Sequence, residues 1–348
     1  PADKWVVEGQ ARSIQDKICL GANRSTARCF DDIATGDGGY VPEVVGYLAN
    51  PNRPITQISY ATALFWTYLT EQYGTSAPTD PAEAGMDLML RFWENSNATP
   101  GRDGISVLNS TLAGLGHTQR FRDIWKDFAV TNYTKDLSGT GVPAKYRYTD
   151  MSQTGGAYGP VALALDRALD PGDGVVDADE TVYPWAARYY QVRPAATLPM
   201  IHITVTQDSA VPLYYTLLGI KGNDIAYEQH AESRHFARAL PNDSYDKVVL
   251  IVAGLENLAN YRYSINGTQP TLNILDPTSA NKARVGDPSA PEKFRVALEV
   301  LTPGGSPMSG VQLSDFQFRV GTQVVPASSI LVSATVMSQQ WFVLRAPV

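Results

Sequence analysis

The stretch "SYATALFWTYLTEQYG", residues 59–74, decides the class of the first part of the chain. Its aromatic and aliphatic side chains recur every three or four residues, which is the spacing of one face of an α-helix. Ser59 is a suitable N-cap, and Gly74 is a typical C-terminal stop. We therefore expect an amphipathic helix whose apolar face packs into a core.

Three further segments before residue 137 repeat this pattern. They are "PAEAGMDLMLRFWENS" (81–96), "GISVLNSTLAGLG" (104–116) and "TQRFRDIWKDFAVTNY" (118–133). Aromatic and aliphatic stripes at helical spacing form cores, so we assign them no chemistry. Residues 1–137 are predicted to be an all-α helical domain.

The pattern changes after residue 137. Residues 138–192 are rich in turn-forming and acidic residues and are expected to be an irregular acidic linker region. Beyond them the apolar period becomes two, as in "LPMIHITVTQ" (198–207), and a break rich in Pro, Gly and Ser occupies 275–292. We predict a multidomain α + β chain: the helical domain is followed by two antiparallel β-sandwich domains, immunoglobulin-like or jelly-roll-like, at 193–285 and 286–348.

The composition bounds the function. The chain has 348 residues, of which 44% are hydrophobic and only 18% are charged, with a net charge of −7. No basic stripe is present to neutralise phosphates, so nucleic acid is not an expected partner. No apolar run is long enough to span a membrane. The polar, weakly charged surface favours an extracellular, secreted or cell-surface protein.

Two cysteines, Cys19 and Cys29, flank a short polar loop after the first expected helix. In an oxidising compartment we expect them to form a disulfide that closes this loop. The alternative is a pair of unpaired thiols. No histidine lies nearby, so they make a poor zinc site.

The segment "LDPGDGVVDADE", residues 169–180, is a candidate calcium loop. Its acids Asp170, Asp173, Asp177 and Asp179 surround glycines, and carboxylates are the ligands that calcium prefers. The EF-hand pattern is not met: with Asp170 at the first position, the third and fifth positions are Gly172 and Gly174. The competing interpretation is a solvated acidic linker.

No complete catalytic set occurs in the sequence. The four histidines are His117, His202, His230 and His235, and no His-Glu-x-x-His motif is present. His230 and His235 are five residues apart, which places them on different faces of a helix and on opposite sides of a strand. The sequence also lacks a Gly-x-Ser-x-Gly elbow and a phosphate-binding glycine loop.

The segment "WVVEGQA", residues 5–11, resembles the Trp-Leu-Asn-Glu-Gly-Phe-Ala segment of the gluzincin zinc peptidases. Trp5, Glu8, Gly9 and Ala11 are the matching residues. The phrases "ALFWTYLTEQYG" and "IWKDFAVTNYT" are similar to the helical subdomain that follows this segment in secreted members of the clan. The likeness covers about residues 1–137.

The resemblance implies that Glu8 is the third zinc ligand, on a helix that follows a His-Glu-x-x-His helix. The transition-state group of the clan is not assigned by the resemblance; Tyr60 and His117 are the candidates. Pro1 is not an initiator residue, and only seven residues precede Glu8, so we expect the histidine helix in a missing N-terminal segment. Without it, Arg12 is a candidate partner for the Glu8 carboxylate.

Two functions from different classes follow. The first is the C-terminal portion of an extracellular zinc-metallopeptidase-like protein, with a peptide or protein substrate. In this reading the isolated chain is inactive and binds no metal tightly. The second is a structural or adhesive surface or filament subunit with serial β-domains, which would self-assemble.

Overall fold

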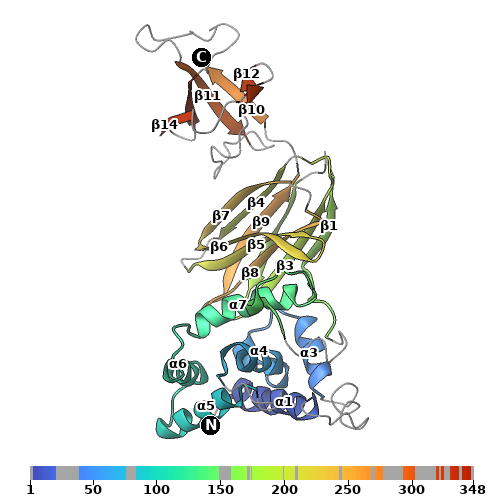
Figure 1. Ribbon diagram of the computed structural model, residues 1–348, viewed down its shortest axis with the longest axis vertical. Coiled ribbons are helices and arrows are strands. Elements are labelled where there is room, and N and C mark those ends of the chain that lie inside the picture. Colours follow the sequence, from blue (N-terminus) through green and yellow to red (C-terminus); the bar gives the residue numbers. More distant parts are fainter. Residues whose placement is uncertain are drawn as a thin grey trace.

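A computed structural model describes most of residues 3–267 and several later strands. The described ranges are 3–20, 39–75, 84–148, 158–170, 173, 175–198, 200–207, 211–242 and 245–267, with strand backbone at 271–276, 293–301, 319–320, 323–324, 330–336 and 339–345. The N-terminal part of these residues is helical and the remainder is rich in β-strands (Figure 1). The expected order of a helical region followed by a β-rich region is confirmed.

The helices lie at one end of the molecule in Figure 1. Their bounds are α1 Lys4–Leu20, α3 Tyr40–Leu48, α4 Ala63–Tyr73, α5 Met86–Ala98, α6 Gly104–Gly114 and α7 Phe121–Thr134, with short 3₁₀ turns η1 Ile55–Gln57, η2 Tyr60–Thr62 and η4 Ala144–Tyr146. The predicted 59–74 helix begins later than expected, because η2 precedes α4. It ends at the predicted Gly74.

Nine strands that follow the helices along the chain form two sheets. Their bounds are β1 Leu165–Leu169, β2 Val176–Val182, β3 Ala187–Pro194, β4 Met200–Gln207, β5 Leu213–Lys221, β6 Asp224–Ser233, β7 His235–Pro241, β8 Lys247–Ala253 and β9 Ala259–Asn266. One sheet has the order β1-β3-β8-β5-β6 and the other β2-β9-β4-β7. All neighbours are antiparallel except β1 and β3, which are parallel.

The three central strands of the five-stranded sheet, β3, β8 and β5, are buried on both faces. Tyr189 of β3 and Val249 of β8 belong to one hydrophobic cluster with the helices. The next residue of each strand, Tyr190 and Leu250, belongs to a second cluster shared with the four-stranded sheet. Because side chains alternate along a strand, this sheet serves as the middle layer between the helices and the other sheet.

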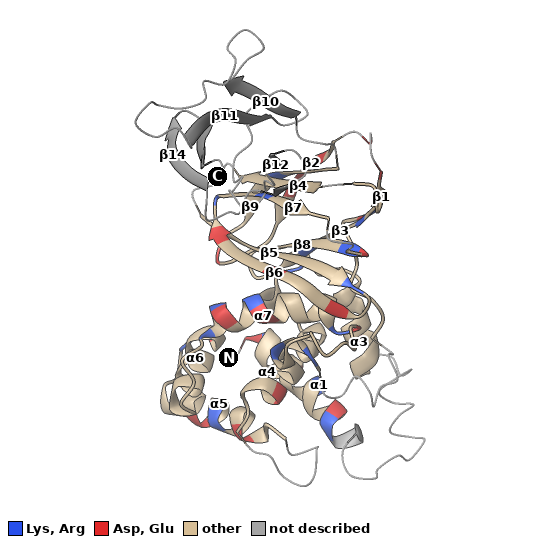
Figure 2. Cartoon of the chain, turned by 45° about the horizontal axis from the view of Figure 1, so that its top comes forward, with Lys and Arg blue, Asp and Glu red and all other residues tan. Residues whose placement is uncertain are grey.

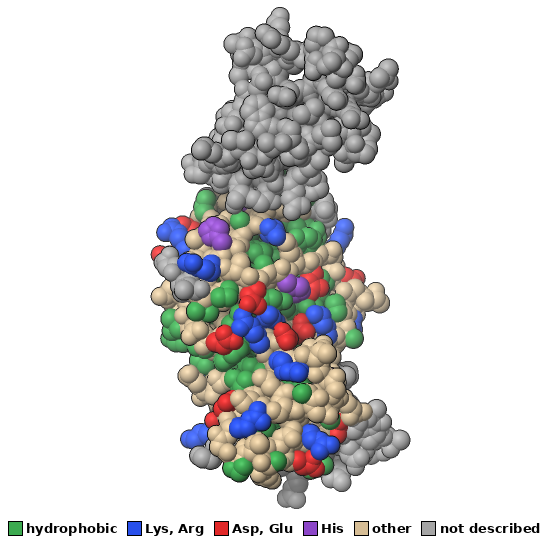
Figure 3. Space-filling model, turned by 90° about the vertical axis from the view of Figure 1, so that its left-hand side faces the viewer, with side chains coloured by type: hydrophobic (Ala, Val, Ile, Leu, Met, Phe, Trp, Pro, Cys, Tyr) green, Lys and Arg blue, Asp and Glu red, His purple; other side chains and the backbone are tan. Residues whose placement is uncertain are grey.

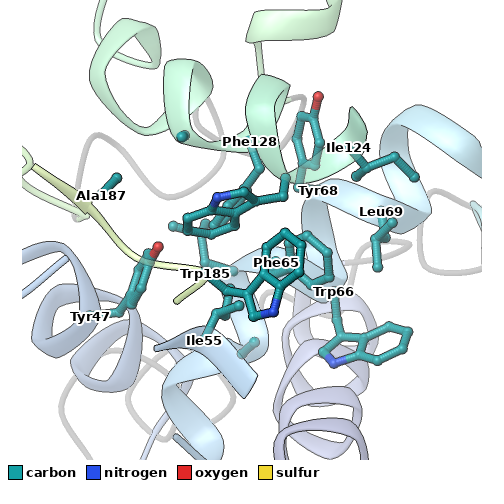
Figure 4. Close-up of a cluster of buried hydrophobic side chains, with 14 of the residues drawn as sticks. Tyr47, Ile55, Phe65, Trp66, Tyr68, Leu69, Ile124, Phe128, Trp185 and Ala187 are labelled. Carbon is teal, nitrogen blue, oxygen red and sulfur yellow. The ribbon is translucent and has the colours of Figure 1, made fainter. Parts of the chain in front are cut away.

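Trp185, in the turn between β2 and β3, joins the sheet to the helices. Its ring lies edge-on to Phe121 of α7, with the ring centroids 4.8 Å apart. Its carbonyl accepts a hydrogen bond from the backbone N–H of Ile55, and its own N–H donates to the carbonyl of Leu255. Trp185 has a φ of +52°, which is strained for a residue with a side chain. Figure 4 shows it among the aromatic side chains of the helical layer.

The expected boundary at 192/193 falls within β3. The segment 138–192, expected to be irregular, holds η4, β1, β2 and most of β3. In "VDADETV" the acids Asp177 and Asp179 occupy exposed positions of β2, and their charge conceals a period-two pattern. The helices and the first sheet also share one continuous core.

Strands further along the chain form a separate four-stranded antiparallel sheet. It has the order β10-β11-β15-β14, from β10 Thr271–Asp276, β11 Lys293–Leu301, β14 Ile330–Val336 and β15 Gln339–Arg345. β12 Arg319–Val320 and β13 Gln323–Val324 form a small additional pair. Among the described residues, no helix combines the length and apolar character needed to cross a bilayer.

Candidate functional site

Glu8 lies in the second turn of α1, on the side that faces away from the core. Trp5 is 2% exposed and Gly9 is buried, whereas Glu8 is partly exposed and Ala11 is exposed. The motif residues therefore separate into two sets with different roles. Packing accounts for Trp5 and Gly9, and it leaves the Glu8 carboxylate accessible.

Gly9 is required by the packing of α1 on η2 and α4. A Cβ atom added at Gly9 would lie 2.0 Å from Oγ1 of Thr62 and 2.7 Å from Cδ1 of Trp66. The absence of a side chain at Gly9 allows Thr62 and Trp66 to pack against α1.

Tyr60 lies beside Glu8. A hydrogen bond to the Glu8 carboxylate, followed by the negative charge of that group, raises the pKa of the Tyr60 hydroxyl. The Arg12 guanidinium lies 4.7 Å from the centroid of the Tyr60 ring, and its Nη1 donates to Oε1 of Gln15 over 2.8 Å. Within the described residues, Arg12 contacts the ring of Tyr60 and forms no ion pair with Glu8.

His117, the other candidate transition-state group, lies far from Glu8. Its Nε2 is 2.7 Å from the carbonyl oxygen of Tyr73, and its ring is edge-on to the Tyr73 ring. Tyr73 ends α4, whereas Tyr60 precedes the start of α4. An eleven-residue helix is about 16 Å long, so the two candidates lie at opposite ends of it.

The residues around Glu8 do not form a zinc site by themselves. Zinc in peptidases takes three protein ligands from His, Cys, Asp or Glu side chains. Across the ranges that the structure describes, no three such side chains are grouped to hold a metal. Glu8 is next to the phenol of Tyr60, and the guanidinium of Arg12 contacts the Tyr60 ring. Neither a phenol nor a guanidinium is a favoured zinc ligand.

The other predicted sites have different outcomes. Cys29 and the side chain of Cys19 lie outside the described residues, so the disulfide stays a prediction. The calcium loop also stays a prediction, and the structure gives the contacts of three of its acids. Oδ2 of Asp173 accepts from the backbone N–H of Asp170, while Asp177 pairs with Arg262 of the neighbouring strand.

A polar cluster that sequence reasoning missed joins the helices to β6. The Tyr146 hydroxyl of η4 donates to Oε1 of Glu228 over 2.5 Å, and Nε2 of His230 lies 2.7 Å from the same oxygen. Nδ1 of His230 lies 2.9 Å from Oγ1 of Thr216. The hydrogen bond from His230 is the main cause that lowers the pKa of Glu228.

Ion pairs continue this contact along α7. Arg122 pairs with both Glu232 and Glu256, and Lys126 pairs with Glu232 over 2.8 Å. Charged side chains and a histidine gather in the middle of the face in Figure 3. The period-two spacing of Glu228, His230 and Glu232 places their side chains on one face of β6. Their partners on the helices are not visible in the sequence.

The charges of the described residues show no stripe of one sign. Lys and Arg alternate with Asp and Glu over the helices and both sheets in Figure 2.

No protein-family model and no curated protein matches the chain. Among solved structures, a pre-peptidase C-terminal domain of a collagenase from Bacillus anthracis is 16% identical, with a TM-score of 0.24, over 30% of this chain and 97% of that chain. A periplasmic inhibitor of g-type lysozyme from Aeromonas hydrophila is 9% identical, with a TM-score of 0.21, over 29% of this chain and 97% of that chain.

Tripeptidyl peptidase 2 is also similar in part. It is 9% identical, with a TM-score of 0.25, over 44% of this chain and 14% of that chain. All three scores are too low to support an argument about fold or function, so the function rests on the residues themselves.

Proposed function

We propose that the chain is the C-terminal portion of a secreted zinc-metallopeptidase-like protein. Glu8 is its carboxylate zinc ligand, and the two histidine ligands belong to a segment outside these 348 residues. The substrate is a peptide or protein. As an isolated polypeptide the chain is inactive and holds no zinc tightly.

One observation supports this proposal most directly. The "WVVEGQA" helix is fixed by its buried residues Trp5 and Gly9, yet the same helix leaves Glu8 partly exposed beside the Tyr60 hydroxyl. An accessible carboxylate on a rigidly packed helix is the arrangement that a third zinc ligand requires. Of the two candidate transition-state groups, Tyr60 is the one close enough to act with it.

The test compares this chain with the longer protein that its gene encodes. Zinc content and peptide hydrolysis are measured for both, and for Glu8→Gln in the longer protein. We expect about one zinc and peptidase activity in the longer protein, and neither in the 348-residue chain. Glu8→Gln should lower zinc affinity at least about 10-fold, since one of three ligands is lost.

Glu43→Gln is the matched control, because Glu43 is another partly exposed carboxylate whose charge acts on Tyr60. It should retain zinc. Stoichiometric zinc in the 348-residue chain contradicts the proposal. So does a gene without His-Glu-x-x-His about twenty residues ahead of Glu8, the spacing expected for this ligand order.

We further propose that the later strands, β10 to β15, form a separate immunoglobulin-like β-domain. Its support is the antiparallel order β10-β11-β15-β14, which none of the strands β1 to β9 joins. The nine strands before it are proposed as a β-sandwich that is docked on the helices.

A structural or adhesive subunit is the alternative, and strand exchange would be its means of assembly. Two of the four edge strands of the nine-stranded region carry side-chain contacts to neighbouring elements. The edge strand β6 is joined to the helices through Tyr146, and Arg238 of the edge strand β7 donates to Gln229 of β6. Concentration-dependent assembly, measured by light scattering, would favour this alternative.

A further inference from the structure

We propose that Arg12 is a substrate-binding residue beside Glu8 and that it recognises a carboxylate group of the peptide. The inference rests on the proposed function, because it assigns a substrate class to the same site. The sequence makes Arg12 a candidate partner for the Glu8 carboxylate. Within the described residues, however, the Arg12 guanidinium contacts only neutral groups.

Two neutral neighbours hold the guanidinium of Arg12. It lies 4.7 Å from the centroid of the Tyr60 ring, which is a cation–π distance. Its Nη1 donates to Oε1 of Gln15 over 2.8 Å. These contacts orient the group without neutralising its charge. The side chain is therefore fixed in direction before a ligand arrives, and this lowers the entropic cost of binding.

Arg12 also keeps unused hydrogen-bonding capacity. An arginine side chain carries several N–H donors, and Gln15 accepts from one of its nitrogens. The Nε atom of Arg12 has no hydrogen-bond partner in the described part of the chain, although the residue is partly exposed. Arg122, Arg188 and Arg193, in contrast, each pair with a carboxylate of this chain. A cation without such a pair is suited to bind an anion from outside the chain.

Arg12 and Glu8 project from the same side of α1. Residues four apart on a helix are neighbours on its surface, with Cβ atoms about 6 Å apart. Both side chains are partly exposed, and the buried residues Trp5 and Gly9 fix the helix beneath them. One peptide residue spans at most about 3.5 Å. A peptide whose scissile carbonyl lies at Glu8 therefore reaches Arg12 with a group one or two residues away.

A carboxylate is the peptide group that Arg12 recognises best. The planar guanidinium donates two parallel N–H bonds to the two oxygens of a carboxylate, and a single carbonyl oxygen does not offer this arrangement. The carboxylate is either the C-terminus of the peptide or the side chain of an Asp or Glu. In both cases the proposed substrate is a peptide with a negative charge close to the cleaved bond.

The first arm of the experiment measures hydrolysis by the longer protein that the gene encodes. The substrates are a peptide with a free C-terminal carboxylate, the same peptide as its amide, and the amide with an aspartate next to the cleaved bond. We expect kcat/KM to be about 10- to 100-fold higher for a carboxylate peptide than for the neutral amide, mainly through KM. The preferred carboxylate peptide identifies the source of the charge.

Variants of Arg12 test whether this residue causes the preference. Arg12→Gln removes the charge and should abolish the preference, whereas Arg12→Lys keeps the charge without the planar fork and should restore only part of it. Arg91→Gln is the matched control, because it removes the same charge from an exposed arginine of α5. A loss of folded protein lowers the rates for all substrates equally, so the ratio of rates reports recognition alone.

The second arm measures binding without zinc. The longer protein is stripped of metal with a chelator, and N-acetyl-trialanine is titrated by NMR as its free acid, as its amide, and as the amide with aspartate in the central position. We expect a carboxylate form to bind at least about 10-fold more tightly than the neutral amide. Arg12→Gln should remove this difference, and Arg12→Lys decides the question if Arg12→Gln does not fold.

Equal binding and hydrolysis of charged and neutral peptides would overturn the inference, as would a preference that survives in Arg12→Gln. Zinc-dependent hydrolysis without an effect of Arg12 rejects the role of Arg12 and leaves the proposed function standing. Binding of carboxylate peptides that depends on Arg12, in a longer protein that takes up no zinc, rejects the proposed function and leaves this inference standing.

Discussion

At the scale of single residues, His202 is the side chain whose burial has the clearest consequence. It lies on β4, is 5% exposed, and neither ring nitrogen has a hydrogen-bond partner among the described residues. Burial therefore disfavours the charged imidazolium and lowers the pKa of His202 from 6.5 to about 4.

This shift predicts a loss of stability in acid. The unfolded chain takes up a proton at His202 below pH 6.5, whereas the folded chain does so only near pH 4. The free energy of unfolding should therefore decrease as the pH falls from about 6.5 to about 4, by about 3 kcal/mol in total, and this contribution stays constant below that range.

Urea unfolding of the wild type and of His202→Gln at a series of pH values measures this effect. The variant lacks the titrating group, so the stability difference between the two proteins should change with pH in that window. His117→Gln is the control at a partly exposed histidine. Parallel curves for wild type and His202→Gln would show that His202 does not titrate as described.

At the scale of elements, the contact between η4 and β6 is an intramolecular interface built from polar groups. The Tyr146 hydroxyl is buried against Glu228, and burial followed by the hydrogen bond to Glu228 raises the pKa of Tyr146. The Lys145 ammonium lies 4.5 Å from the centroid of the Tyr146 ring. A charge-assisted bond at a partly buried site contributes more than a surface ion pair.

We predict a coupling free energy of about 1.5 kcal/mol between Tyr146 and Glu228. A double-mutant cycle with Tyr146→Phe, Glu228→Gln and their combination measures it by urea unfolding. The exposed pair Arg91–Glu94 on α5 is the comparison, with a coupling of about 0.4 kcal/mol that disappears in 1 M salt. Equal coupling at the two sites would contradict the assigned role of the η4–β6 contact.

The elements differ in how far the sequence predicts them. The helix ending at Gly74 and the strand β4 follow from the spacing of their apolar residues. β2 does not, because its alternate residues include acids, which also occur in loops. The candidate site was found only in part: Glu8 follows from its motif, whereas its proximity to Tyr60 depends on how η2 packs against α1.

At the scale of the whole molecule, the helices and the nine-stranded region should unfold together. Residues on one face of the first sheet, such as Tyr189, Leu218 and Val249, are buried only in the cluster that contains the helical side chains. A fragment without helices would expose this face to water. Burial of each large apolar side chain contributes about 1.5–3 kcal/mol, so the exposure is strongly unfavourable.

We predict one cooperative transition for residues 1–267, followed by tryptophan fluorescence and by far-UV circular dichroism. The two signals should have the same midpoint, because Trp125 and Trp185 report the contact between layers while the helices dominate the dichroism. A fragment covering 138–267 should aggregate. Two separate transitions, or a soluble folded fragment, would instead support independent helical and β domains.

The proposal for the whole protein is that Glu8 shares a zinc ion with ligands from outside these 348 residues. Anomalous diffraction at the zinc absorption edge, from crystals of the longer protein, locates zinc directly. The account predicts a zinc peak about 2 Å from a carboxylate oxygen of Glu8, with two histidine nitrogens at similar distances. A crystal that contains zinc elsewhere, with the Glu8 carboxylate bonded only to Tyr60, would contradict it.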